Sequence, residues 1–384
     1  MNFEFATATR IIFGAGRLLE AGKLVAELGS RALVLTGRDQ TRSEQLVPLL
    51  NEHGISTIQM PVEGEPTTRL VQEGVALARR HACDVVIGMG GGSTMDCGKA
   101  ISALLTNEGD IYDYLEVVGR GMSLKRPSAP FVAIPTTAGT GTEVTRNAVL
   151  GVPEHKVKVS LRSYFLLAKL AIIDPSLTMS MPPAVTASTG LDALTQLIEP
   201  FVCNSPNPVT DAICRAGLGL VARSLRRVYQ NGEDLSSRED MSIAALFSGM
   251  ALANARLGAV HGFAGVIGGT LDAPHGIICA SLLPYVMTTN IHALNQRDPQ
   301  NQVLLRYDEV ARILTGNHQA KAVDGENWLK EVCDDLSVPP LANFGLTREQ
   351  FPEIIEKSMK ASSMKGNSIL LTYEELDEIL TLAT

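Results

Sequence analysis

Asp192, His261 and His275 have the side-chain types needed to hold a divalent metal ion. Asp192 and Gln196 are four residues apart, so on a helix their side chains share one face. The two histidines each lie between small residues, in VHG and PHG. Two imidazoles and one carboxylate are usual ligands of Zn²⁺ or Fe²⁺, with an open position for a substrate oxygen. The alternative, that each is an ordinary structural residue, stays open at this point.

A glycine-rich segment could hold a phosphate group. The segment GMGGGS, residues 88–93, follows a predicted strand and opens a predicted helix. Glycines let the backbone approach a pyrophosphate, and a helix N-terminus offers free N–H donors. Ser93 would cap the helix or bind phosphate. Alone, such a segment is equally well explained as a tight turn. A second turn of small and hydroxyl residues, 135–142, also follows a strand, and together the two favour a dinucleotide cofactor.

The first half of the chain predicts an α/β domain. Apolar runs predict buried strands at 31–36, 56–61, 84–89, 131–134 and 171–173. Apolar residues at helical spacing predict helices at 43–53, 67–81 and 95–105. Strands that alternate with helices are typical of a doubly wound parallel sheet.

The second half predicts helices alone. Segments at helical period cover 184–201, 208–229, 238–254, 281–293 and 304–314. We therefore predict a dinucleotide-binding α/β domain over residues 1–178 and an all-helical metal and substrate domain over residues 179–384. The crevice between two such domains is the expected ligand site.

Charge and composition exclude some partners. The 384 residues have a net charge of −8, with 45% hydrophobic and 19% charged residues. This balance is that of an ordinary globular protein, and its negative charge disfavours nucleic acid or an anionic membrane as partner. The sequence shows neither a signal-peptide pattern nor an apolar run of membrane-spanning length, and its six cysteines are widely separated. We expect a cytoplasmic protein with reduced thiols.

Several segments resemble motifs of the iron-containing (group III) alcohol dehydrogenase family. GGGSTMDCGK at 90–99 resembles GGGSxxDxxK, and PTTAGTGTEVT at 135–145 resembles PTTAGTGSEVT. TGLDALT at 189–195 is similar to the start of TGxDALTHxxE, and the VHG and PHG segments resemble the two histidine motifs. The resemblance runs in order over nearly the whole chain. It implies a dehydroquinate synthase-like fold, an α/β N-terminal domain followed by an all-helical C-terminal domain. It also implies hydride transfer between a nicotinamide cofactor and a small alcohol or aldehyde.

The resemblance assigns roles only where residues match. It places the pyrophosphate at 90–93, the adenine and ribose near Thr136, Thr137 and Thr142, and the nicotinamide ribose near Lys158. The expected cofactor-binding residues are Gly37, Asp39, Gly90, Gly91, Gly92, Ser93, Asp96, Thr136, Thr137, Thr140, Thr142 and Lys158. Asp192, His261 and His275 match three of the four metal ligands and are the expected catalytic residues.

Two departures weaken the match at the metal. Gln196 stands where the family has its fourth ligand, a histidine, and a neutral amide oxygen binds a transition metal less well than imidazole. Gly265 replaces a second histidine close to the nicotinamide, which removes a candidate proton relay. Because three ligands are kept, we expect a divalent metal, Fe²⁺ or Zn²⁺, held by those three with Gln196 as a candidate fourth.

The cofactor preference is read from the end of the second strand. Gly37 stands where NAD-preferring relatives carry an acidic residue, and Arg38 and Arg42 lie nearby. This favours NADP over NAD, although Asp39 argues the other way.

Other functions stay open from the sequence. A metal-independent reductase of an oxo acid, similar to maleylacetate reductases, would use a histidine as proton donor. A dehydroquinate synthase-like lyase and a catalytically decayed binding protein are further alternatives. The substrate is expected to be a small molecule, an alcohol, aldehyde or oxo acid, and relatives suggest a homodimer.

Overall fold

The computed structural model describes residues 2–39, 41–155, 157–271 and 273–384, and the side chain of Arg42 lies outside this description. The chain forms two compact units. The α/β unit consists of Ala6–Thr137 and Gly141–Thr178, and the helical unit of Met1–Phe5, Ala138–Thr140 and Met179–Thr384.

The α/β unit is built on a parallel sheet. Within the described ranges, six strands form this sheet in the order β1-β8-β5-β4-β2-β3. Their bounds are β1 Ile11–Phe13, β2 Arg31–Thr36, β3 Ser56–Pro61, β4 Val85–Gly90, β5 Phe131–Pro135 and β8 Leu170–Ile173. Each neighbouring pair is parallel, so the carboxyl ends of all the strands meet at one edge. The predicted doubly wound sheet is confirmed.

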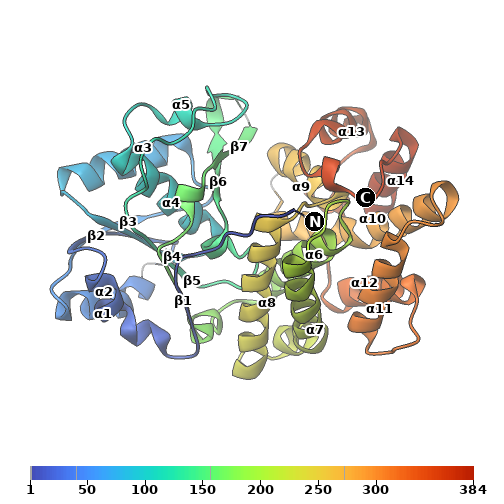
Figure 1. Cartoon of the computed structure of the whole chain (residues 1–384), viewed down its shortest axis with the longest axis horizontal. Helices are drawn as coiled ribbons and strands as arrows, with labels where there is room; N and C mark the ends of the chain where they lie inside the picture. Colours follow the sequence, from blue (N-terminus) through green and yellow to red (C-terminus); the bar gives the residue numbers. More distant parts are fainter. Residues whose placement is uncertain (1, 40, 156, 272) are drawn as a thin grey trace. The chain divides into compact units, whose positions relative to one another are not determined.

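Helices cover both faces of this sheet (Figure 1). On one face, residues such as Val34, Ile87 and Val132 form a common apolar core with α1, Ala21–Ala26, and α2, Thr41–Glu52. On the other face lie α3, Thr68–Arg80, and α4, Gly92–Thr106. A Cβ at Gly98 of α4 would lie 2.5 Å from the ring of Phe131, which shows how closely α4 approaches the sheet. The central strands β4, β5 and β8 are buried at every residue because both of their faces are covered, whereas the edge strand β3 is largely exposed or half-buried.

An antiparallel hairpin lies beside α4. It consists of β6, Asn147–Val152, and β7, Val157–Arg162, and a short helix α5, Ile111–Tyr114, precedes β5. The buried Lys99 of α4 donates to the carbonyls of Thr145 and Asn147, at 2.9 and 3.1 Å. This lysine therefore ties α4 to the segment that leads from the second polar turn into the hairpin.

The helical unit packs around two buried helices. Its helices are α6 Pro183–Val202, α7 Pro208–Gln230, α8 Leu235–Asn254, α9 Ala259–Thr270, α10 His275–Arg297, α11 Val303–Thr315, α12 Ala322–Asp335, α13 Phe351–Lys360 and α14 Tyr373–Ala383. From Thr186 to Val202, nearly every residue of α6 is buried. It packs against α7, α8 and α10. A Cβ at Gly190 of α6 would lie 2.4 Å from Leu225 of α7, so small residues allow this close packing. The residues that α6 carries are thus fixed by contacts on all sides.

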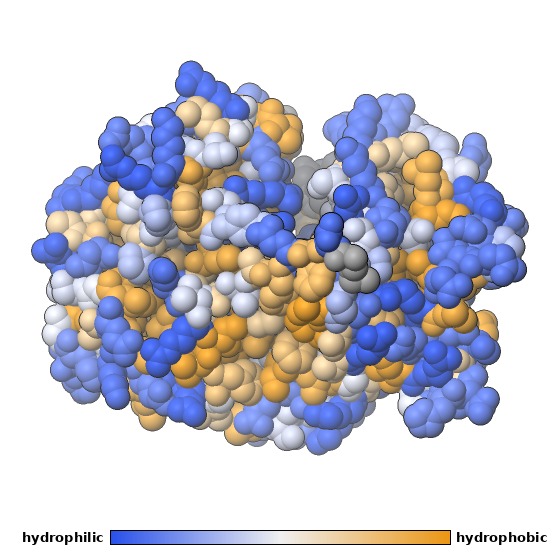
Figure 2. Space-filling model, viewed as in Figure 1, coloured by the Kyte–Doolittle hydropathy of each residue, from blue (hydrophilic) through white to orange (hydrophobic). Residues whose placement is uncertain are grey.

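Helix α10 also belongs to the interior. Among the described helices it is long and apolar enough to cross a membrane, but 78% of its apolar window is buried inside the protein. A helix that is apolar all round and buried is typical of a protein core. Figure 2 shows hydrophilic residues along much of the edge of the visible face, with apolar residues interspersed.

Candidate metal centre and cofactor site

Asp192 is a buried carboxylate with one oxygen left without a partner. It lies on α6, where burial of the whole helix places its side chain in the interior. Its Oδ2 accepts a hydrogen bond of 3.1 Å from Nε2 of Gln196, one turn later. Its Oδ1 is buried and has no hydrogen-bond partner among the described residues. An isolated buried carboxylate oxygen is costly, so this atom indicates a cation as its partner.

His261 faces Asp192 because a second carboxylate orients its ring. Nδ1 of His261 lies 2.6 Å from Oε2 of Glu199, and since a carboxylate can only accept, this nitrogen carries the proton. Nε2 of His261 then faces Oδ1 of Asp192, 3.6 Å away, and can act as a metal ligand once it has lost its proton. A carboxylate behind an imidazole is the usual support of a metal-ligating histidine.

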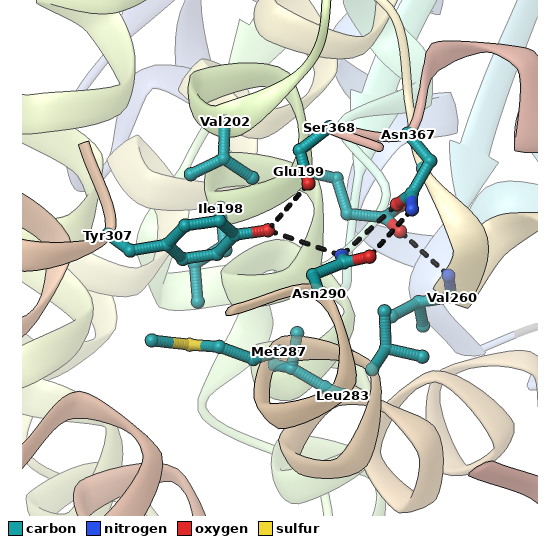
Figure 3. A pocket seen from close by; sticks show the side chains of 12 residues that line it. Ile198, Glu199, Val202, Val260, Leu283, Met287, Asn290, Tyr307, Asn367 and Ser368 are labelled. Carbon is teal, nitrogen blue, oxygen red and sulfur yellow. Dashed lines mark hydrogen bonds between the residues drawn. The ribbon is translucent and has the colours of Figure 1, made fainter. Parts of the chain in front are cut away.

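A polar network holds Glu199 and the start of α9 in place (Figure 3). Oε1 of Glu199 accepts a 2.8 Å hydrogen bond from the backbone N–H of Val260, in the first turn of α9. The side-chain oxygen of Asn367 accepts from the N–H of Ala259, and its amide pairs with Asn290 at 2.6 Å. Asn290 in turn donates to the hydroxyl of Tyr307. Figure 3 shows Glu199, Asn290, Tyr307, Asn367 and Ser368 around a pocket whose other labelled side chains are apolar. Two N–H groups in the first turn of α9 are thus satisfied, one by Asn367 and one by Glu199.

His275 and Cys279 approach the same point from α10. His275 is the first residue of that helix, and its Nε2 lies 3.8 Å from Oδ1 of Asp192. Cys279 follows one turn later, with Sγ 3.6 Å from Nε2 of His275 and 4.0 Å from Nε2 of His261. The donor atoms of Asp192, His261, His275 and Cys279 all lie within 4.8 Å of one another. Residues of these types at such separations fit a divalent metal ion.

Without a metal ion, the two imidazoles of this group have raised pKa values and therefore bind protons more tightly than usual. Burial alone would raise the pKa of Asp192, but the imidazoles beside it outweigh burial and hold that pKa below its ordinary value. The sulfur of Cys279 is the largest cause that raises the pKa of His275 to about 9. Burial opposes the charge on His261, yet Cys279 and Glu199 together raise its pKa well above the ordinary value. A metal ion therefore has to displace protons when it binds.

The sheet edge in the α/β unit brings the predicted phosphate-binding residues together. Gly37 follows β2, Gly90 ends β4, and Thr136 follows β5, in strands that are hydrogen-bonded neighbours. The N–H of Thr136 donates to the carbonyl of Gly90 at 2.9 Å. A Cβ at Gly90 would lie 2.4 Å from Oγ1 of Thr94, and one at Gly91 would lie 3.5 Å from Thr137. Glycine at position 90 is therefore required by the close packing against Thr94, at the N-terminus of α4, where N–H groups and the helix dipole favour a phosphate.

Other predicted cofactor residues make contacts within the protein. Oδ1 of Asp39 accepts from the N–H and hydroxyl of Thr41 at the start of α2. Oδ2 of Asp96 accepts from the N–H of Val149 in β6, and Lys158 of β7 pairs with Glu65 at 3.1 Å. Gly92 and Ser93 form the first turn of α4, Thr142 begins a short 3₁₀ helix, and Thr140 belongs to the helical unit. Asp39 and Lys158 are therefore engaged by neighbouring side chains in this structure.

Two residues of the candidate metal site, the donor Cys279 and the supporting carboxylate Glu199, were not predicted from the sequence. Glu199 fell within the predicted helix 184–201, but no role was assigned to it. Cys279 was counted only among the separated thiols. A signal was present for Cys279, because residues four apart share a helix face and Cys279 follows His275 by four.

Comparison with known proteins agrees with this fold. Residues 8–175 match the family model for iron-containing alcohol dehydrogenase, and residues 186–384 match the C-terminal model of the Fe-containing alcohol dehydrogenase family. The chain belongs to the iron-containing alcohol dehydrogenase family and is an oxidoreductase that acts on CH–OH groups. The family and fold inferred from the sequence motifs are confirmed.

Individual relatives cover essentially the whole chain. It is 36% identical over 371 residues to 1,3-propanediol dehydrogenase of Klebsiella pneumoniae. This alignment covers 96% of this chain and 92% of that protein. It superposes on the crystal structure of a 1,3-propanediol oxidoreductase with a TM-score of 0.93, 33% identity and full coverage of both chains. It also matches sulfoacetaldehyde reductase from Bifidobacterium kashiwanohense in complex with NAD⁺, with a TM-score of 0.88 and 26% identity over 100% of this chain and 99% of that one.

Proposed function

We propose that this protein transfers hydride between a nicotinamide cofactor and a short-chain aldehyde or alcohol, with a divalent metal held by Asp192, His261 and His275. The observation that carries the proposal is the convergence of these donors on the buried, unpaired Oδ1 of Asp192. An ion held there would supply Lewis acidity toward the substrate oxygen.

The chain's own residues orient and protect this site. Glu199 keeps the proton of His261 on Nδ1, so that Nε2 stays available as a ligand. Gln196 occupies Oδ2 of Asp192 and thereby directs Oδ1 toward the two imidazoles. In the α/β unit, the N-terminus of α4 would bind the pyrophosphate of the cofactor, with Gly90 and Gly91 giving the backbone access. Dinucleotide binding by residues 1–178 and metal binding by residues 179–384 belong to the same proposal.

The names of the relatives favour a small primary alcohol as substrate. We therefore take 1,3-propanediol and its aldehyde, with other short alcohols and aldehydes, as the first compounds to test. The predicted homodimer and cytoplasmic location stay predictions.

The test is an assay of the purified full chain before and after metal removal. We expect oxidation of NADPH or NADH by short aldehydes to vanish after chelation and dialysis. It should return with Fe²⁺ or Zn²⁺ and stay absent with Mg²⁺, which prefers oxygen ligands. Activity that survives complete metal removal would contradict the metal-dependent mechanism and support a metal-independent reductase with a histidine as proton donor. Tight cofactor binding without turnover would indicate a binding protein.

We further propose NADP as the preferred cofactor, because Gly37 places no charge where the 2′-phosphate would lie. Asp39, the residue that argued for NAD, is engaged by Thr41. Gly37→Asp is expected to raise the ratio of kcat/KM for NADH to that for NADPH by about tenfold or more, since a carboxylate repels the 2′-phosphate and accepts from the 2′-hydroxyl. The new side chain has room, because a Cβ at Gly37 meets Thr94 only at 3.9 Å.

Gly37→Asn is the matched control, because it adds the same shape without the charge. Steady-state kinetics with both cofactors measure the ratio. An equal shift in Gly37→Asn would show that charge is not the cause, and a strong preference of the unchanged protein for NADH would contradict the choice of NADP.

A further inference from the structure

The candidate metal site contains a fourth donor, Cys279, in addition to Asp192, His261 and His275. Nε2 of Gln196 donates to Asp192, and its Oε1 lies 3.4 Å from the hydroxyl of Ser248. Gln196 is thus engaged on both ends of its amide. The sulfur of Cys279, in contrast, lies next to the two imidazole nitrogens that face Asp192. We propose that Cys279 is the fourth protein ligand of the metal and takes over this role from residue 196. The inference rests on the metal-dependent function proposed above.

The distances fit a four-coordinate ion. With metal–nitrogen and metal–oxygen bonds near 2.0 Å and a metal–sulfur bond near 2.3 Å, tetrahedral ligand atoms lie about 3.3 Å apart for nitrogen and oxygen and about 3.5 Å apart for nitrogen and sulfur. Here the nitrogen–oxygen distances are 3.6 and 3.8 Å, and the nitrogen–sulfur distances are 3.6 and 4.0 Å. These four distances exceed the tetrahedral values by up to about half an ångström, and all six donor–donor distances are within 4.8 Å, so the donors have to move inward when an ion binds.

The local fold explains why Cys279 can act with His275. Both lie on α10, four residues apart and therefore on one face of the helix. Asp192 comes from α6 and His261 from α9, so three helices of the helical unit supply the donors. The buried and unpaired Oδ1 of Asp192 lies near both imidazoles. This orphan oxygen is the second observation, beside the thiol, that points to an ion at this place.

The chemistry of a thiolate changes the preference of the site. When the ion binds, the Cys279 thiol loses its proton to solvent, so Asp192 and Cys279 together balance the two charges of the metal. A soft sulfur ligand suits Zn²⁺ or Co²⁺ better than a neutral amide oxygen does. We therefore expect this chain to prefer Zn²⁺ to Fe²⁺, even though its family is named for iron.

Cobalt titration of the metal-free full chain tests the inference without an activity assay. We expect one Co²⁺ per chain and an intense near-ultraviolet absorption from thiolate-to-cobalt charge transfer. In Cys279→Ser this absorption should disappear, and the Kd for Co²⁺ and Zn²⁺ should rise about tenfold or more. The matched control is Cys333→Ser, in which the hydroxyl can replace the thiol that donates to the carbonyl of Ala280. That variant should keep the absorption and the Kd.

The outcomes separate this inference from the proposed function. One Co²⁺ per chain without thiolate absorption in the unchanged protein would overturn the role of Cys279 and leave the metal-dependent function standing. An unchanged spectrum in Cys279→Ser would overturn it as well. Failure of the unchanged protein to bind Co²⁺ or Zn²⁺ would remove both proposals. The thiolate absorption is measured on the unchanged protein and needs no variant. The inference therefore stays testable if Cys279→Ser does not fold.

Discussion

Replacing His275 with alanine is expected to lower kcat by about a hundredfold or more and to leave the Kd of the nicotinamide cofactor within about twofold. The variant removes one imidazole from the candidate metal site, so the ion should bind weakly or not at all. The side chain of His275 is 40% exposed, and it begins α10 without filling the core, so the fold should persist. The proposed pyrophosphate site is in the α/β unit, which the substitution leaves unchanged. Steady-state kinetics, cofactor fluorescence titration and metal analysis give the three measurements.

His292→Ala provides the matched control. His292 lies on the same helix, is exposed and contacts Gln296, so its loss should change neither kcat nor metal content. If His275→Ala keeps full turnover, the metal model fails. If it loses turnover while the unchanged protein works without any metal, His275 is a proton donor in a metal-independent reductase.

Gly276→Ala is expected to destabilise the helical unit by about 2–3 kcal/mol and to weaken metal binding about tenfold or more. A Cβ at Gly276 would lie 2.1 Å from the backbone carbonyl oxygen of Ser188 in α6. Backbone cannot rotate aside as a flexible side chain can, so α10 has to move away from α6. His275 is the residue just before Gly276, and Asp192 is one turn beyond Ser188. The same movement that costs stability therefore separates two of the proposed ligands.

Urea unfolding of the metal-free protein measures the first effect, and metal titration of the folded variant measures the second. Gly269→Ala in α9 is the control, because a Cβ there has no described atom within 4 Å. Alanine should stabilise that helix by up to about 1 kcal/mol through its higher helix propensity. Equal stability of Gly276→Ala and the unchanged protein would show that α6 and α10 do not pack as closely as described.

The ranges of two strands and three long helices were predicted closely from the sequence. Strands β2 and β3 match their predicted ranges, and the helices α6, α7 and α11 differ from theirs by a residue or so at each end. The three helices are long and carry apolar residues at helical period, and β2 is a continuous apolar run, whereas β3 matches although only one of its residues is buried. The hairpin β6–β7 was missed, because short strands that are only half buried carry a weak apolar pattern. The start of α10 was placed six residues too late.

That late start also explains what was missed in the site. Pro274 and Gly276 suggest a loop, but Gly276 is needed for the approach of α10 to α6, a requirement that arises only in the folded protein. Once α10 begins at His275, Cys279 falls on the same face as His275. Asp192, His261 and His275 were predicted as a group and do converge. Gln196 was a candidate ligand, and in the structure its amide nitrogen donates to Asp192.

The hydrogen bond from Gln196 to Asp192 bears on which ions can compete for the site inside a cell. With Oδ2 occupied by an N–H donor, Asp192 presents a single oxygen, and the remaining donors are two nitrogens and a sulfur. Mg²⁺ and Ca²⁺ are bound in proteins almost entirely through oxygen, with six or more ligands. Neither ion can meet that requirement here, so the most abundant divalent cations of a cell are poor competitors, and the scarce transition metals can be taken up in their presence.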